Sequence, residues 1–173
     1  ESGFISALIN KKDIKHEDYN AVFWFSVLTG CTLYLLLFFA SPLIASFYEI
    51  PELTPLARYS FLGFLISSFG VAQNAYLFRN LMVKQKSISL IIGLSVSGCV
   101  GVAMAYFGFA YWGIATQSIV NIATINLCYL YFSPWRPTLN IDFTPLKGMF
   151  MFSSKLLLTN IFKHLNDHIL TII

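Results

Sequence analysis

The chain has 173 residues and a formal net charge of +3, and its composition is 57% hydrophobic, 17% aromatic and only 11% charged. A soluble globular domain carries about 25% charged residues, so this composition, with its mean hydropathy of +0.69, excludes that class. It predicts an all-α, multi-pass transmembrane helical bundle, because the short alternating segments of a membrane β-barrel are absent. The small positive charge gives no indication of a nucleic-acid partner.

Uncharged runs mark the expected helices, since about 20 apolar residues span a bilayer. The expected elements are spans over residues 19–44, 54–78, 87–107 and 113–132, then a final helix beginning at Thr144. Thr54 and Thr144 each precede a proline, a sequence typical of an N-cap followed by the first helical position. Residues 108–113 hold two glycines among aromatic residues and predict a tight hairpin.

Charge in the connections predicts the orientation. Connections alternate between the two sides of a membrane, so residues 10–18, 79–86 and 133–147 share one side, and they hold eight Lys or Arg. The other two connections hold one, Arg58. The positive-inside rule therefore places the basic connections in the cytoplasm. Residues 3–9 are too few to span a membrane and the last helix stops in mid-pattern, so we expect a fragment of a longer protein.

Small residues recur every four positions in the third expected span, at Gly93, Ser97, Gly101 and Ala105. This spacing lets helices approach closely in lipid, so we interpret it as a packing face and not as a ligand site. Three cysteines, Cys31, Cys99 and Cys128, lie far apart within apolar spans. Without a CxxC pair or a ligand cluster, we interpret them as buried apolar residues with no redox or metal role.

The final helix is strongly amphipathic. Its apolar stripe repeats every three or four residues, and its other half is polar, comprising Lys155, Thr159, Asn160, Lys163, His164, Asn166, Asp167 and Thr171. An ionisable group that faces lipid at mid-membrane costs about 2.5–3.5 kcal/mol, so this polar half requires protein or water around it.

Two interpretations of these charges stay open. In one, Lys155 extends to the cytoplasmic interface and Lys163 pairs with Asp167 one turn further on. In the other, the face lines a hydrated cavity whose cations bind an anionic substrate and whose acid binds a coupling ion. His164 and His168 have the spacing of a metal-binding pair, but no further ligand motif accompanies them, so we expect a polar surface and no metal.

Several strings, in this order and spacing, resemble those of one known family. They are GFISALINKKD (3–13), VFWFSVLTG (22–30), PLIASFYEIPEL (42–53), RNLMVK (79–84), GFAYWGIATQ (108–117) and WRP (135–137). Together they are similar to the bacterial polysaccharide flippases of the multidrug/oligosaccharidyl-lipid/polysaccharide exporter superfamily. The resemblance implies two six-helix lobes around a cavity that opens alternately to each side. Residues 1–143 would belong to the N-terminal lobe, from the end of helix 2 through helix 6, and residues 144–173 would begin helix 7 of the C-terminal lobe.

The resemblance also implies a function. Such proteins translocate undecaprenyl-pyrophosphate-linked oligosaccharide repeat units across the bacterial inner membrane for surface polysaccharide biosynthesis, without covalent chemistry or a cofactor. Lys155 and Lys163 would then meet pyrophosphate or acidic sugar, Asn160 and His164 would line the route, and Asp167 would couple to an ion. The implied partners are the lipid-linked oligosaccharide, membrane lipid, and the polysaccharide polymerase and chain-length regulator proteins.

Two alternatives are weighed against this carrier. One is a membrane-embedded polymerase or acyltransferase of the same pathway, which should carry catalytic acids or histidines in a large extramembrane loop. The short non-cytoplasmic connections count against it. The other is a drug or cation exporter of the same superfamily, against which the basic face counts because it favours anions.

Overall fold

The computed structural model describes residues 14–139, and the all-α prediction is confirmed there, with no strand in this range. The helices are α2 (His16–Phe47), α3 (Leu53–Ser68), α4 (Val71–Arg79), α5 (Val83–Tyr106) and α6 (Ala110–Phe132). The helix expected from Thr144, the boundary between residues 143 and 144, and the five site residues predicted on that helix lie outside the described residues.

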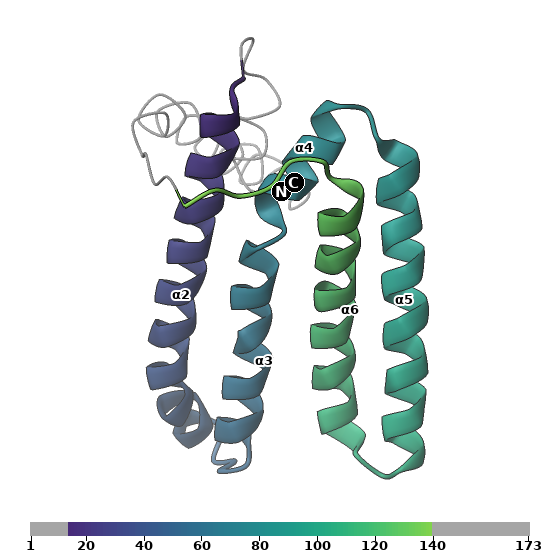
Figure 1. Cartoon of the computed structure of the whole chain (residues 1–173). Coiled ribbons are helices and arrows are strands. Elements are labelled where there is room, and N and C mark those ends of the chain that lie inside the picture. Colours follow the sequence, from purple (N-terminus) through teal and green to yellow (C-terminus); the bar gives the residue numbers. More distant parts are fainter. Residues whose placement is uncertain (1–13, 140–173) are drawn as a thin grey trace, which may run out of the picture.

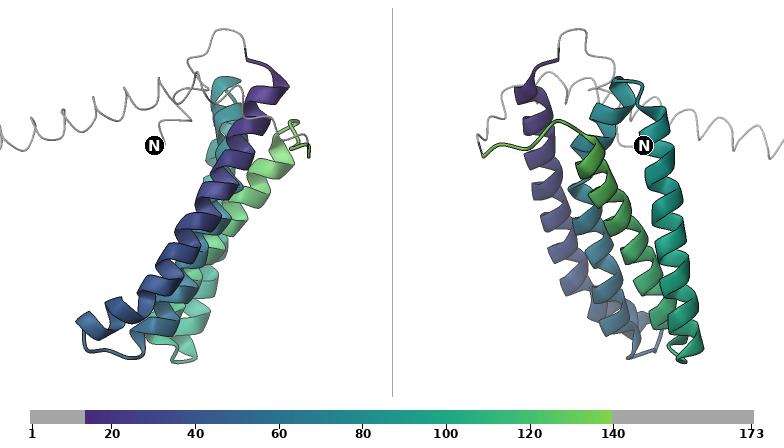
Figure 2. Two further views of the ribbon diagram at one scale, coloured as in Figure 1. Left: turned by 90° about the vertical axis from the view of Figure 1, so that its left-hand side faces the viewer. Right: turned by 45° about the vertical axis from the view of Figure 1, so that its right-hand side comes forward.

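The four long helices lie in one layer, in the order α2, α3, α6, α5 (Figure 1). Two antiparallel hairpins, α2 with α3 and α5 with α6, meet along the contact between α3 and α6. The short α4 lies across one end, against α2, α5 and α6. Viewed along the layer, the long helices overlap one another (Figure 2). A layer one helix thick leaves broad apolar faces for lipid or for further helices.

The expected sidedness of the connections agrees with this arrangement. The start of α2, the link from α4 to α5 and the end of α6 lie at one end of the layer, and the α2–α3 and α5–α6 turns lie at the other (Figure 1). Five of the six Lys and Arg in the described range lie at the first end, and Arg58 is the sixth. Arg58 lies inside α3 and not in a loop as the sequence pattern suggested.

The expected span over residues 54–78 is the main departure from the prediction. It is broken after Ser68, and α3 and α4 are bent by 42° to each other. The N-cap expected at Thr54 is also wrong, because the cap is Glu52, two residues earlier, and α3 begins at Leu53. The carbonyls of Ile50 and Pro51 already accept the N–H groups of Leu53 and Thr54, at 3.1 and 3.2 Å, so no side-chain cap is required.

The predicted aromatic hairpin is present but shorter than expected. Only residues 107–109 connect α5 to α6, and Gly108 adopts φ +80°, a left-handed conformation that glycine enters at little cost. Gly113 lies within α6, where an added Cβ would be 3.3 Å from the Cβ of Met104. The second glycine therefore serves helix packing and not the turn.

Length and composition allow two of the described helices, α2 and α5, to cross a membrane, or three if the bent pair α3 and α4 forms one span. The predicted multi-span membrane protein is thereby supported. The 23-residue α6 carries no charge, but Gln117, Asn121 and Asn126 lower its hydropathy, and it is not among those spans. Its assignment as a span remains a prediction.

Candidate functional site: a polar seam beside the helix break

Local hydrogen bonds contribute to the end of α3 within the uncharged stretch that follows Arg58. The hydroxyls of Ser67 and Ser68 donate back to the carbonyls of Phe64 and Leu65, at 3.3 and 2.6 Å. Such bonds bend helices, and Gly70, two residues after Ser68, also weakens helical continuity here. The chain resumes as α4 when the N–H of Asn74 donates to the carbonyl of Gly70 at 2.9 Å.

Asn126 of α6 holds the break from across the interface. Its side-chain amide donates to the carbonyl of Ile66 at 2.5 Å, and its oxygen lies where a Cβ on Gly70 would stand. Gly30 of α2 approaches from another side, because a Cβ there would be 2.8 Å from the Cβ and Oγ of Ser68. The break is therefore enclosed by α2 and α6, which fix its geometry.

Buried amides follow the break. Gln73 is 1% exposed, and neither its amide nitrogen nor its amide oxygen has a hydrogen-bond partner among the described residues. The side-chain oxygens of Asn74 and Asn121 are also buried without a partner in this range. We call Gln73, Asn74, Asn121 and Asn126 the polar seam. Unpaired buried polar groups are costly and rare, so the three residues with unpaired amide atoms, Gln73, Asn74 and Asn121, require an explanation.

The predicted packing face of α5 is confirmed over Gly93, Ser97 and Gly101, whereas Ala105, its last member, is exposed. Ser89, Gly93 and Ser97 are buried, and a Cβ at Gly93 would be 2.5 Å from Cγ1 of Ile125 and 3.0 Å from the side-chain oxygen of Asn121. A Cβ at Gly101 would be 2.7 Å from the amide oxygen of Gln117. The small residues therefore admit the amide-bearing face of α6.

A second polar contact ties α2 to α3 near the opposite end. The Nε–H of Arg58 donates to the hydroxyl of Ser41 at 3.0 Å, and the guanidinium carbon Cζ lies 4.2 Å from the ring centroid of Phe38. These contacts give Arg58 both a hydrogen-bond acceptor and an aromatic face. Tyr59 shares a 3.2 Å hydrogen bond with Thr116 of α6.

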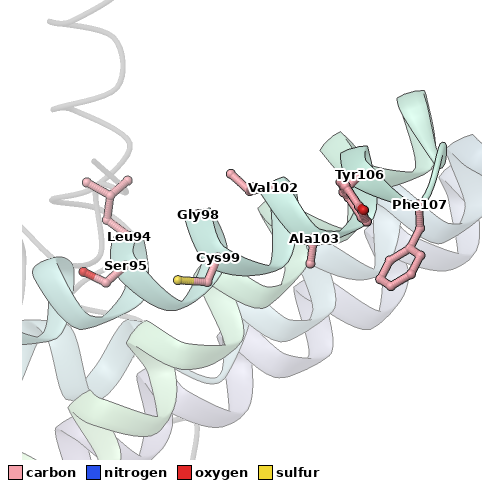
Figure 3. Close-up of a pocket in the computed structure, with 8 residues that line it drawn as sticks. All are labelled: Leu94, Ser95, Gly98, Cys99, Val102, Ala103, Tyr106 and Phe107. Atoms are coloured by element: carbon pink, nitrogen blue, oxygen red, sulfur yellow. The ribbon is translucent and has the colours of Figure 1, made fainter.

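The outer side of α5 has a shallow apolar groove of about 640 Å³, lined by Cys99 and its neighbours on the same helix (Figure 3). The three cysteines are free thiols, but Cys99 is exposed, so its expected burial is wrong. The reason is that α5 is the last helix of the layer and Cys99 faces away from α6. No group of three or more His, Cys, Asp or Glu that could hold a metal occurs in residues 14–139.

The site predicted from the sequence lies on the final helix, where Lys155, Asn160, Lys163, His164 and Asp167 stay untested predictions. The polar seam was not predicted. The available signal was the presence of Asn and Gln within uncharged helices, since an amide in a membrane span requires a partner.

The layer of long apolar helices, one of them broken beside buried amides, defines a helical membrane protein. A family model described as "Polysaccharide biosynthesis protein" matches residues 1–173, so the chain belongs to the polysaccharide biosynthesis protein family.

Three curated relatives give further detail. The chain is 26% identical over 156 residues to the teichuronic acid biosynthesis protein TuaB of Bacillus subtilis, covering 89% of this chain and 32% of that protein. It is 25% identical over 178 residues to the lipopolysaccharide biosynthesis protein WzxC of Escherichia coli, covering 99% and 35%. An uncharacterized membrane protein in the cps region of Klebsiella pneumoniae is 24% identical over 176 residues, covering 99% and 36%. The chain thus spans about a third of the length of these relatives. No solved structure matches it.

Proposed function

We propose that the protein containing this chain translocates lipid-linked oligosaccharide repeat units, carried on undecaprenyl pyrophosphate, across the bacterial inner membrane for surface polysaccharide biosynthesis. The observation that carries this proposal is the family match over the whole chain. A relative named for teichuronic acid and another named for lipopolysaccharide agree with a glycan pathway.

The structure supports a carrier over an enzyme. At the end opposite the basic connections, residues 48–52 and 107–109 are the only connections in the described part of the chain. Neither is long enough to form an extramembrane catalytic loop. The unpaired buried amides of this range lie instead between helices, near the break, and broken helices next to buried polar groups are typical of secondary transporters.

In this proposal, the polar half of the final helix meets the substrate. Lys155 and Lys163 supply positive charge for pyrophosphate or acidic sugar, Asn160 and His164 supply hydrogen bonds, and Asp167 binds the coupling ion. Polymerase and chain-length regulator proteins are the proposed partners downstream.

The test is to locate lipid-linked repeat units in cells that lack the full-length gene. We expect complete units to accumulate in the cytoplasmic leaflet and surface polysaccharide to be lost. Single units that reach the periplasm without being polymerised would instead indicate a polymerase and overturn the proposal.

The site is tested by complementing the same cells with full-length variants. Lys163→Ala and Asp167→Asn should fail to restore surface polysaccharide at normal protein levels. Leu165→Met, on the apolar stripe of the same helix, is the matched control and should restore it. Full complementation by both polar variants would contradict the assignment of these residues.

A further inference from the structure

A groove of about 380 Å³ lies at the end of the layer where the basic connections meet, apart from the polar seam. Three segments build it: the start of α2, the end of α4 and the stretch after α6. The side chains that matter for its chemistry are Lys15, His16, Tyr19, Tyr76, Arg79 and Trp135.

The stretch after α6, residues 133–139, crosses the layer from α6 to the first turns of α2 (Figure 1). Its place is fixed by two hydrogen bonds at Thr138: its N–H donates to the side-chain oxygen of Asn20 at 2.9 Å, and its carbonyl accepts from the indole of Trp24 at 2.8 Å. His16 lies 3.2 Å from the carbonyl of Arg136. The groove wall is therefore held in place by contacts distant in sequence.

Aromatic rings form one side of the groove. The ring centroid of Tyr19 lies 5.5 Å from that of Tyr76 and 5.9 Å from that of Trp135, and His16 lies 5.6 Å from Trp135. Tyr19 and Trp135 are 4% and 5% exposed, and the Tyr19 hydroxyl and the Trp135 indole N–H have no hydrogen-bond partner among residues 14–139. Both polar atoms are buried, so these rings form a packed, largely apolar wall of the groove.

Basic groups form the other side. Lys15 and Arg79 line the groove with His16, whereas the neighbouring acids Glu17 and Asp18 do not. The Asp18 carboxylate is buried and accepts the backbone N–H of Lys15 at 2.9 Å, which fixes the start of α2. Lys and Arg beside aromatic rings favour an anion with oxygen acceptors, and Arg suits phosphate because it can donate two parallel bonds.

Size and position narrow the ligand further. Pockets for small molecules measure roughly 300–1,000 Å³, so this groove of about 380 Å³ suits a single small headgroup better than an oligosaccharide. Trp and Tyr are typical of the membrane interface, which is where a lipid presents its phosphate. We propose that the groove binds the phosphate headgroup of an anionic phospholipid, such as phosphatidylglycerol, in the leaflet at this end of the layer. The proposal does not depend on the translocation activity.

The experiment measures the affinity of purified full-length protein for short-chain phosphatidylglycerol and phosphatidylcholine by native mass spectrometry. We expect preferential binding of phosphatidylglycerol. Lys15→Gln/Arg79→Gln should weaken it about tenfold, the change expected from losing a charged hydrogen bond. Lys84→Gln/Lys86→Gln is the matched control, because both lysines lie at the same end but outside the groove, and it should change the affinity less than about twofold.

Three results would overturn the proposal: equal affinity for the two lipids, equal weakening by the two double variants, or displacement of phosphatidylglycerol from the groove by undecaprenyl pyrophosphate at lower concentration. The second would indicate general surface charge, and the third would indicate a substrate site. If the double variant does not fold, Lys15→Gln alone provides the test, because Lys15 is exposed and its side chain does not support the core.

Discussion

The side-chain oxygen of Asn126 occupies the place where a Cβ on Gly70 would stand, and its amide nitrogen donates to the carbonyl of Ile66 at 2.5 Å. One side chain of α6 thus satisfies a backbone group at the end of α3 and fits against the glycine that precedes α4. The break between these helices depends on both residues.

Gly70→Ala should destabilise the protein by about 1–3 kcal/mol, because the added methyl group overlaps Asn126 and forces it from its hydrogen bond. The measurement is the unfolding temperature of full-length protein in detergent. Gly98→Ala is the control, since a Cβ there has no described atom within 4 Å. An equal effect of the two substitutions would contradict the packing at the break.

Gly93→Ala should destabilise the contact between α5 and α6 by a similar amount, because a Cβ at Gly93 would be 2.5 Å from Cγ1 of Ile125. Ile125→Ala in the same protein removes that contact, so the double variant should lose less stability than the two single losses added together. Strict additivity, measured by thermal unfolding, would show that the two residues do not contact each other.

Gln73→Leu and Asn126→Leu should have opposite effects. Gln73 has no hydrogen-bond partner among the described residues, so replacing it with an apolar side chain should raise the unfolding temperature. Asn126→Leu removes the bond to Ile66 and should cost about 1–3 kcal/mol. If the polar seam serves transport, Gln73→Leu should also lower the amount of surface polysaccharide in complemented cells. A variant that gains stability and loses activity would fit the general trade-off between the two. A destabilised Gln73→Leu variant would show that this amide has a partner.

Arg58→Ala should cost about 1–2 kcal/mol, because it removes both the bond to Ser41 and the contact with the ring of Phe38. Arg58→Lys keeps the positive charge near the ring but lacks the guanidinium Nε, so an intermediate loss is expected. Thermal unfolding of the two variants would contradict the assigned contacts if the lysine variant were the less stable of the two.

The orientation can be checked by labelling single cysteines in full-length protein without native cysteines. Glu52→Cys and Phe107→Cys lie in or beside the two short turns and should react with an impermeant maleimide in intact spheroplasts. Lys84→Cys lies at the basic end and should react only after the membrane is permeabilised. The reverse pattern would invert the orientation assigned from charge.

The break between α3 and α4 could not be predicted from the sequence. Residues 54–78 are uncharged apart from Arg58 and apolar enough for one span, and Ser67, Ser68 and Gly70 are all tolerated within membrane helices. Whether such residues bend a helix depends on the neighbours that receive the freed backbone groups. Here the carbonyl of Ile66 accepts a hydrogen bond from Asn126, which lies 60 positions further along the chain.

One candidate site was predicted from the sequence, and two were found only in the tertiary structure. The polar half of the final helix was identified from periodicity alone, and its role remains a prediction. The polar seam and the groove at the basic end were not identified. Amides within uncharged helices were a signal for the polar seam, but which groups lie buried together is decided only when distant segments meet. Trp24 and Thr138, for example, are 114 positions apart and are joined by one hydrogen bond.

The sequence by itself determined the membrane class, the positions of most helices, the shared side of the basic connections and the packing face of α5. These properties sum contributions from single residues or repeat at the helical period, so they can be computed without knowing which helix is the neighbour. Only the tertiary structure decided the order α2, α3, α6, α5, the bend between α3 and α4, and the groove closed by residues 133–139. Those depend on contacts between segments distant in the chain, and helical periodicity carries no information about which segments meet.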